Sequence, residues 1–248
     1  SGSQEYMAAE KLYELFNDDR FDLVIVDTPP TREALDFLEA PQKLMNFLDH
    51  RVYRWLVMPA RGGLRVLNFA AQPILKTIGR VIGADVLADA INFFQAFDGI
   101  EEGFRQRALA VQTLLKSTDS KYVVVASAHH DTIREAIFFT DELARVGTPV
   151  TGLIINRLQP KFGKGSATSS ATAARKAEQA GDTELAALHG NLAHVRRIVQ
   201  AEEATLKPLL DSVGTALVVR LYQRATDVHD LDAIADLGRD LVASTPTR

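Results

Sequence analysis

Residues 21–31 have the sequence FDLVIVDTPPT, and this stretch decides the expected fold class. It begins with a run of aromatic and branched apolar residues and ends the run at Asp27. A continuous apolar run of this length predicts a β-strand that is buried on both faces, as in a parallel sheet. The two prolines that follow prevent an immediate helix, so Thr31 is placed to cap a helix that starts at Arg32.

Similar apolar runs recur along the chain and alternate with helical patterns. The further strand-like runs are 122–126, 150–155 and 216–219, and the helical patterns are 6–17, 131–146, 171–210 and 230–242. Strands that alternate with helices indicate an α/β protein with a parallel sheet and right-handed crossovers. A long helical pattern, 41–117, is broken at prolines and glycines and separates the first two runs. We therefore expect an α/β core of 1–40 and 118–248, with a helical insert subdomain at 41–117.

The composition excludes several classes of protein. With 46% hydrophobic and 24% charged residues among 248, the chain is neither collagen-like nor disordered. A net charge of −4 and a pI near 5.9 argue against a nucleic-acid partner. The lack of cysteine excludes disulfides, thiol catalysis and thiolate zinc sites, so we expect no zinc. No run is apolar enough for a signal peptide or a membrane span, which predicts a cytoplasmic protein.

Charge is distributed unevenly along the chain. The segment Lys43–Arg80 contains seven basic side chains, a single acid, Asp49, and many apolar residues. Two interpretations remain open. The arginines are either the solvated face of an ordinary helical subdomain, or part of a surface that binds a hydrophobic client helix or an anionic membrane. In the second case the protein would also associate with membranes.

Asp27 is the main candidate for a functional residue. In open α/β sheets, ligands bind outside the carboxyl ends of the strands. A carboxylate at such a position can hold the water shell of a Mg²⁺ ion beside a nucleotide. On residue type alone, however, an aspartate at the end of a strand is common.

Two further stretches have weaker chemical signals. The adjacent histidines of His129-His130-Asp131 do not share a helix face, so we expect loop contacts from them and a helix cap from Asp131. Residues 162–174, FGKGSATSSATAA, are rich in glycine, serine and threonine and predict a flexible loop.

The segment 21–41, FDLVIVDTPPTREALDFLEAP, resembles the switch II segment of the ArsA-type ATPases, the family of arsenite pumps and tail-anchored-protein-targeting ATPases. The resemblance includes Asp27, Thr28, Pro30 and Thr31, whereas Pro29 replaces an alanine. Residues 4–12, QEYMAAEKL, are similar to the upstream segment of the actinobacterial branch. The order of a helical insert, a strand, a helix and a strand ending in asparagine is also that of the family.

This resemblance implies a P-loop NTPase-like sheet, ATP or ADP with Mg²⁺ as cofactors, and a homodimer or a heterodimer with a paralogue. Asp27 would be the Walker B-like aspartate that binds Mg²⁺ through water. Asn156 would match the asparagine that binds adenine, although a simple turn cap after a strand is the alternative for this residue. The implied nucleotide-contacting residues are Thr28, Pro29, Pro30, Thr31, Asn156 and Arg157.

One departure from the family concerns the phosphate-binding loop. Only 26 residues precede Asp27, and none of them forms the motif G-x-x-x-x-G-K-[ST]. The nearest similar stretch, FGKGS at 162–166, lacks the required spacing. We therefore expect the C-terminal portion of an ArsA-like ATPase, with a sheet that lacks the P-loop strand and no ATP hydrolysis by the chain alone. The alternative is a non-catalytic, ATPase-derived scaffold that binds a hydrophobic partner or a membrane surface.

Overall fold

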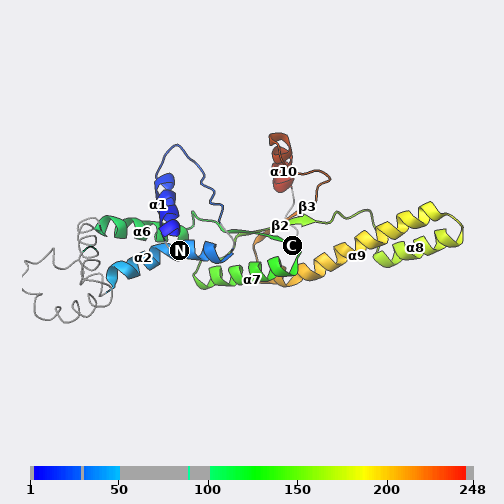
Figure 1. Cartoon of the computed structure of the whole chain (residues 1–248), viewed down its shortest axis with the longest axis horizontal. Helices are drawn as coiled ribbons and strands as arrows, with labels where there is room; N and C mark the ends of the chain where they lie inside the picture. Colours follow the sequence, from blue (N-terminus) through cyan, green and yellow to red (C-terminus); the bar gives the residue numbers. More distant parts are fainter. Residues whose placement is uncertain (1–2, 29–30, 51–88, 90–100, 244–248) are drawn as a thin grey trace, which may run out of the picture. The chain divides into compact units, whose positions relative to one another are not determined.

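The structure, a computed structural model, describes residues 3–28, 31–50, 89 and 101–243. The chain divides into two compact units, Ser1–Ser117 and Thr118–Arg248, and each is described by itself (Figure 1). The described part of the first unit is helical, whereas the second combines a sheet with helices. The prediction that 1–40 and 118–248 share one core stays a prediction, and most of the expected insert at 41–117 lies outside the described residues.

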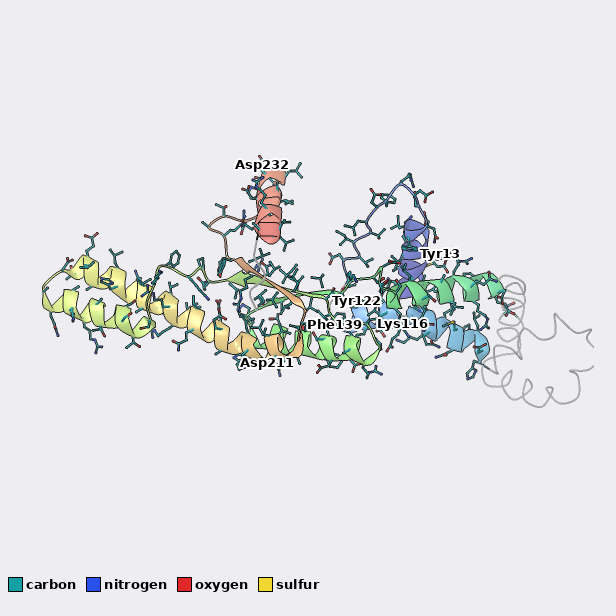
Figure 2. The ribbon with its side chains drawn as sticks, turned by 180° about the vertical axis from the view of Figure 1, so that it is seen from behind. Tyr13, Lys116, Tyr122, Phe139, Asp211 and Asp232 are labelled. Carbon is teal, nitrogen blue, oxygen red and sulfur yellow. The ribbon has the colours of Figure 1, made fainter. Side chains whose placement is uncertain are left out.

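Three helices form the described part of the N-terminal unit: α1 (Ser3–Phe16), α2 (Thr31–Asp49) and α6 (Glu101–Lys116). Each contacts the other two, and they share an apolar core. That core consists of Ala9, Leu12, Phe37 and Val111, with Tyr13 packed against it (Figure 2). Helix α2 continues through the expected boundary at Pro41, which is fully buried inside it.

A polar cluster links α1 to α6 beside this core. Arg107 donates a hydrogen bond from Nε to Glu10 Oε2 at 2.7 Å, and the Tyr6 hydroxyl donates to the other oxygen of Glu10. The Arg107 guanidinium also lies 4.9 Å from the centre of the Phe104 ring, a cation–π arrangement. Burial and the hydrogen bond to Glu10 raise the pKa of Tyr6, so its hydroxyl keeps its proton and acts as the donor.

The stretch predicted to be the first strand is not a strand in the structure. Residues 21–28 form an irregular segment between α1 and α2. Ile25 is 82% exposed, whereas Val24 is partly buried and packs against the helical core. A strand needs neighbouring backbone groups to complete its hydrogen bonds, and the described elements of this unit are all helices. The strand prediction for this stretch is therefore wrong.

The C-terminal unit contains a parallel sheet of three strands in the order β1 (Val123–Ser127), β2 (Gly152–Leu158) and β3 (Leu217–Tyr222). Helix α7 (His130–Arg145) joins β1 to β2, and α8 (Ala167–Gln179) and α9 (Thr183–Ser212) join β2 to β3. Helix α10 (Leu231–Ala243) follows β3 and contacts it. The predicted α/β class with a parallel sheet is confirmed for this unit.

The core of this unit lies between the sheet and the helices α7 and α9. Helix α7 packs on β1 and against α9. Leu153 and Ile155 of the central strand are fully buried, as are Leu143 of α7 and Leu206 and Leu209 of α9. The central strand is thus the best-covered element of the sheet.

Helices α8 and α9 form a hairpin, joined by the short turn 180–182 (Figure 1). Helix α8 begins directly after Ser166 and is stabilised by a capping box. The Ser169 N–H donates to Ser166 Oγ at 3.0 Å, and the Ser166 N–H donates to Ser169 Oγ at 3.0 Å. The expectation of a flexible loop over 162–174 is therefore wrong from residue 167 onward, because the serines cap a helix that small residues then continue.

Candidate functional site

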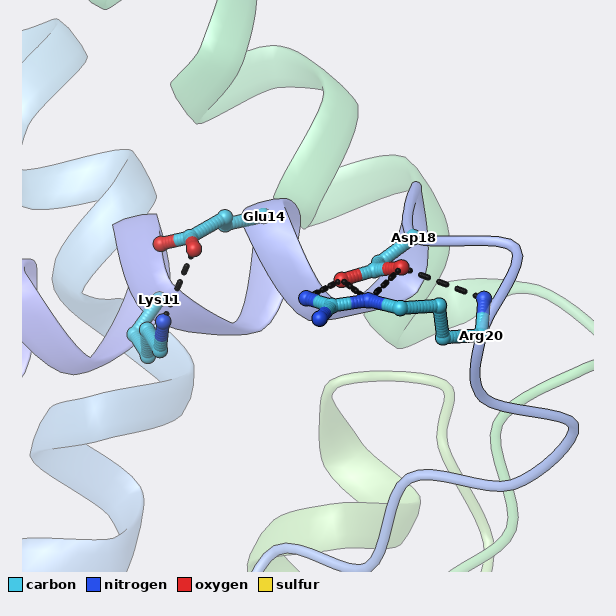
Figure 3. Close-up of polar contacts among 4 residues, drawn as sticks. All are labelled: Lys11, Glu14, Asp18 and Arg20. Atoms are coloured by element: carbon cyan, nitrogen blue, oxygen red, sulfur yellow. Dashed lines mark hydrogen bonds and ion pairs between the residues drawn. The ribbon is translucent and has the colours of Figure 1, made fainter.

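The segment that contains Asp27 leaves α1 through a tight turn at 17–20. The Asp18 carboxylate accepts hydrogen bonds from the Arg20 guanidinium, at 2.6 Å from Nη2, and from the Arg20 backbone N–H at 3.1 Å (Figure 3). The Phe21 N–H donates to the Asp18 carbonyl at 3.1 Å. The hydrogen bonds from Arg20 lower the pKa of Asp18, so this carboxylate stays ionised and holds the turn.

Asp27 lies near the end of this segment, shortly before α2. Asp27 and Thr28 are both exposed. In the described part of the chain, no residue forms an ion pair or hydrogen bond with the Asp27 carboxylate. A free carboxylate that can bind a hydrated cation fits the way proteins commonly hold Mg²⁺. No group of three or more histidine, aspartate or glutamate side chains that could hold a metal occurs in the described ranges.

The remaining residues of this motif lead into α2. Thr31 is the first residue of the helix, one position before the expected start at Arg32. Pro29 and Pro30 lie outside the described residues, and so does the side chain of Thr31. Its capping role therefore stays a prediction.

Asn156 and Arg157 lie at the carboxyl end of β2, where the sheet is irregular. Asn156 pairs with Ser127 of β1, and its Oδ1 accepts the Arg157 backbone N–H at 2.9 Å. Arg157 has φ 60, and the register between β2 and β3 shifts between Ile155 and Leu158. A left-handed backbone is costly for a residue other than glycine, and such conformations concentrate at functional sites. The Asn156 amide thus makes a local turn contact with its oxygen and keeps its NH₂ group as a donor.

Glutamines and a glutamate support this edge of the sheet. The Gln223 N–H donates to the Leu158 carbonyl at 2.7 Å, and Gln159 Nε2 donates to Gln223 Oε1 at 3.2 Å. The Gln159 N–H donates to Glu202 of α9 at 3.0 Å. The sequence analysis did not single out Gln159 or Glu202, because no motif marks them and only the fold brings them together.

A second charged group joins β3 to α9. Glu203 Oε1 accepts from Arg220 Nη1 at 2.9 Å and lies 3.0 Å from Lys161 Nζ. Burial alone would raise the pKa of Glu203, but the hydrogen bonds and positive charges of Lys161 and Arg220 outweigh it. They hold the pKa of this carboxyl below its usual range.

The FGKGS stretch at 162–166 surrounds an arginine of α9. Arg196 donates to Ser170 Oγ at 2.6 Å and to the carbonyl oxygens of Lys164 and Phe162 at 2.8 and 3.0 Å. A Cβ at Gly165, whose φ is 127, would lie 2.8 Å from Arg196 Nη1. A P-loop surrounds phosphate with N–H groups, whereas this loop turns carbonyl groups toward a cation. The stretch is therefore a clamp for Arg196.

The two histidines after β1 do not form a site with Asp131. Helix α7 begins at His130 with His129 as its N-cap residue, and no side chain caps it. Asp131 lies in the first turn and pairs with Arg134 at 2.5 Å, so the predicted cap by Asp131 is wrong. Instead, Thr132 Oγ1 donates to the carbonyl of Ser127 or His129, each at 2.9 Å.

The candidate residues are divided between the two units. Asp27, Thr28 and Thr31 belong to the N-terminal unit, and Asn156 and Arg157 to the C-terminal unit. Among the described residues, no helix is both long and apolar enough to cross a membrane.

A family model described as anion-transporting ATPase matches residues 1–218. The matched range includes every candidate residue, from Asp27 to Arg157. No curated protein matches the chain.

Proposed function

Because the chain belongs to the anion-transporting ATPase family, we propose that it supplies the magnesium-linked switch and the base-binding edge of an ATP site. The family match confirms the resemblance to the ArsA-type ATPases, and an ATPase-type, nucleotide-binding function follows from it in general terms. One observation supports the proposed magnesium-linked switch. The Asp27 carboxylate is exposed and free of partners among the described residues.

Asp27 holds a water ligand of Mg²⁺ in this proposal. Bound Mg²⁺ neutralises charge on the phosphate oxygens of ATP. The part of Asp27 is to orient the hydrated ion, for which its carboxylate needs access to solvent and freedom from competing ion pairs. Both conditions hold for Asp27 in the described structure.

Residues 28–31 connect this carboxylate to α2 and form the switch. A change at Asp27 displaces the start of α2, which packs against α1 and α6. The nucleotide state is thereby passed to the helices of the N-terminal unit, the kind of local ordering that γ-phosphate produces in other nucleotide switches. Pro29 and Pro30 stiffen the link because each fixes its φ angle.

Asn156 and Arg157 form the base-binding edge. The Asn156 NH₂ group is a donor suited to a ring nitrogen of the base, since its oxygen already binds the next backbone N–H. The left-handed backbone at Arg157 is an outlier of the kind found at binding sites.

The chain alone does not hydrolyse ATP in this proposal. Its sequence contains no G-x-x-x-x-G-K-[ST] motif, so the backbone donors that hold the β- and γ-phosphates must come from another polypeptide segment.

Equilibrium binding of fluorescently labelled ATP tests the proposal. The chain is measured alone and after fusion to the P-loop strand and helix of a family member, with and without Mg²⁺. We expect Mg²⁺-dependent binding by the fused protein, weakened at least about tenfold by Asp27→Asn. Asp22→Asn is the matched control, because Asp22 is an exposed acid of the same segment. Equal binding by the two variants, or ATP turnover by the unfused chain, would contradict the proposal.

The second candidate is a non-catalytic scaffold that binds a hydrophobic partner or an anionic membrane surface. The excess of basic residues in Lys43–Arg80 favours it. Within the described part, Lys43 already pairs with Asp36 at 2.5 Å and Glu39 at 3.2 Å. Co-sedimentation with anionic and neutral vesicles tests this candidate, and binding to anionic vesicles without any ATP binding would favour it over the ATPase. The mass of the protein in solution tests the expected homodimer, or heterodimer with a paralogue.

A further inference from the structure

A β-bulge interrupts the pairing of β2 with β3 directly after Ile155. The register places two residues of β2, Asn156 and Arg157, opposite a single residue of β3, Leu221. Arg157 has φ 60, the left-handed conformation that glycine adopts in one common class of bulge. A bulge changes the direction of the side chains beside it and is common next to active sites. The direction of the Asn156 side chain therefore depends on this bulge.

Strand β3 supports the bulge from one side. Asn156 is in register with Ser127, the last residue of β1, so β1 ends where the bulge begins. Beyond the bulge, the Gln223 N–H donates a hydrogen bond to the Leu158 carbonyl at 2.7 Å. A left-handed backbone at a residue such as Arg157 costs free energy and persists only where surrounding contacts hold it. The contact with Gln223 is one of these.

Glu202 of α9 supports the bulge from another side. Its Oε2 accepts a hydrogen bond from the Gln159 backbone N–H at 3.0 Å. Gln159 lies two residues after Arg157, directly beyond the end of β2. A carboxylate is a stronger acceptor for a backbone N–H than a neutral oxygen is. Glu202 thus fixes the chain immediately after the left-handed residue.

The position of Glu202 is itself fixed by the packing of α9. Glu202 lies one helical turn before Leu206 and two turns before Leu209, which are both fully buried, so it shares the side of α9 that faces the core. The next residue, Glu203, accepts a hydrogen bond from Arg220 of β3 at 2.9 Å. From this point α9 extends away to its hairpin with α8 (Figure 1). The Glu202 carboxylate is therefore held at the bulge by the fold itself.

We propose that Glu202 is a positioning residue of the base-binding edge. It holds the bulge at Arg157 and thereby the direction of the Asn156 NH₂ group, without touching the base. This inference rests on the proposed binding of a base by Asn156. When Glu202 is removed, the backbone at Arg157 relaxes and the NH₂ group leaves the direction that the base requires. Because Glu202 belongs to α9, a displacement of the α8–α9 hairpin changes base binding in the same way.

Amide NMR spectra of the full, isotope-labelled chain during titration with adenosine test this role. The Asn156 NH₂ signals are identified by their loss in Asn156→Ala. Adenosine should shift these signals, whereas ribose, which lacks a base, should not. Glu202→Ala should raise the adenosine concentration needed for half of the shift at least about fivefold. Glu202→Gln should retain the response, because its amide oxygen can still accept the Gln159 N–H.

The matched control is Glu184→Ala, which removes an exposed acid from the same helix and should not change the response. The remaining amide signals report whether each variant keeps its fold. A second comparison distinguishes positioning from simple stabilisation. Glycine adopts a left-handed backbone without strain, so adding Glu202→Ala to Arg157→Gly should change neither the Asn156 signals nor the adenosine response of Arg157→Gly.

The outcomes distinguish this inference from the proposed function. An unchanged adenosine response in Glu202→Ala, or an equal loss with and without Arg157→Gly, would overturn the role of Glu202 and leave the base-binding edge intact. The absence of any adenosine response in the unsubstituted chain would overturn the base-binding edge itself, and the role of Glu202 with it.

Discussion

Two apolar runs of similar composition behave differently in the two units. Residues 21–27, FDLVIVD, form an irregular segment in the N-terminal unit, whereas 152–158, GLIINRL, form the central strand of the C-terminal sheet. Ile25 is 82% exposed and Ile155 is fully buried. The difference lies in the neighbours, because β2 has a parallel strand on each side and the described elements around 21–27 are helices. An apolar, β-branched run is thus a candidate strand, and backbone pairing makes it one.

The most direct test of this comparison is to truncate Ile155 and Ile25 in turn. Ile155→Ala leaves a cavity in the central strand and should lower the free energy of unfolding by about 2–5 kcal/mol. Ile25→Ala removes an exposed side chain and should change it by less than about 0.5 kcal/mol. Urea unfolding followed by circular dichroism measures both. A large loss with Ile25→Ala would show that residues 21–27 are buried in solution, against the comparison.

Substitutions of two glycines in the C-terminal unit test how strongly tertiary neighbours decide the effect of an added side chain on stability. Gly165→Ala places a Cβ 2.8 Å from Arg196 Nη1 at a φ of 127 and should destabilise the protein by about 1–3 kcal/mol. Gly190→Ala, inside α9 with nothing within 4 Å, should stabilise it by up to about 1 kcal/mol. Thermal unfolding distinguishes the two signs. A neutral Gly165→Ala would mean that Arg196 does not hold this loop.

Disrupting the polar cluster of the N-terminal unit should have a smaller effect on the free energy of unfolding. Arg107→Ala removes the hydrogen bond to Glu10 and the contact with Phe104, so we expect a loss of about 1 kcal/mol, discounted because both ion-pair partners are partly exposed. Arg134→Ala, which removes a fully solvated pair on α7, is the control and should have no measurable effect. Equal losses of unfolding free energy in the two variants would show that the Arg107–Glu10 contact does not stabilise the packing of α1 on α6.

The smallest expected effect is the pH dependence of the link between β3 and α9. The folded pKa of Glu203 is lowered, so its contribution is present above the ordinary value of 4.5 and is lost as the pH falls through the folded value. Glu203→Gln should flatten the acid side of the stability profile. Glu184→Gln, at an exposed position of α9, should leave it unchanged. Unfolding midpoints between pH 3 and 7 test this, and an unchanged profile for Glu203→Gln would contradict it.

Much of the C-terminal unit could be predicted from local patterns. The three apolar runs and the helices α7 and α10 lie within two or three residues of their predicted bounds, because apolar periodicity records which side of an element is buried. The capping box of Ser166 and Ser169 was missed because serine at the third helical position is a weaker signal than glutamate, and glycine and serine are common in loops. The N-cap at His129 was missed because Asp131 is the better capping residue by type.

For the candidate site, the chemistry of single residues could be predicted and their surroundings could not. Asp27 and Asn156 were identified from a motif. The structure adds that the Asp27 carboxylate has no partner among the described residues, whereas the Asn156 side chain already binds a neighbouring N–H. The contacts of Gln159 with Gln223 and Glu202 join residues 64 and 43 positions apart. No local pattern contains such a pair.

The sequence by itself determined the family, the alternation of strands and helices, and the residues with nucleotide-binding chemistry, because each of these is a property of neighbouring positions. Only the tertiary structure decided that 21–28 stays outside the described sheet, that FGKGS encloses Arg196, and that Val123 and Val125 of β1 are exposed while Leu153 and Ile155 of β2 are buried. These outcomes depend on which distant groups meet, since backbone pairing, carbonyl coordination of a cation and apolar burial are interactions in space.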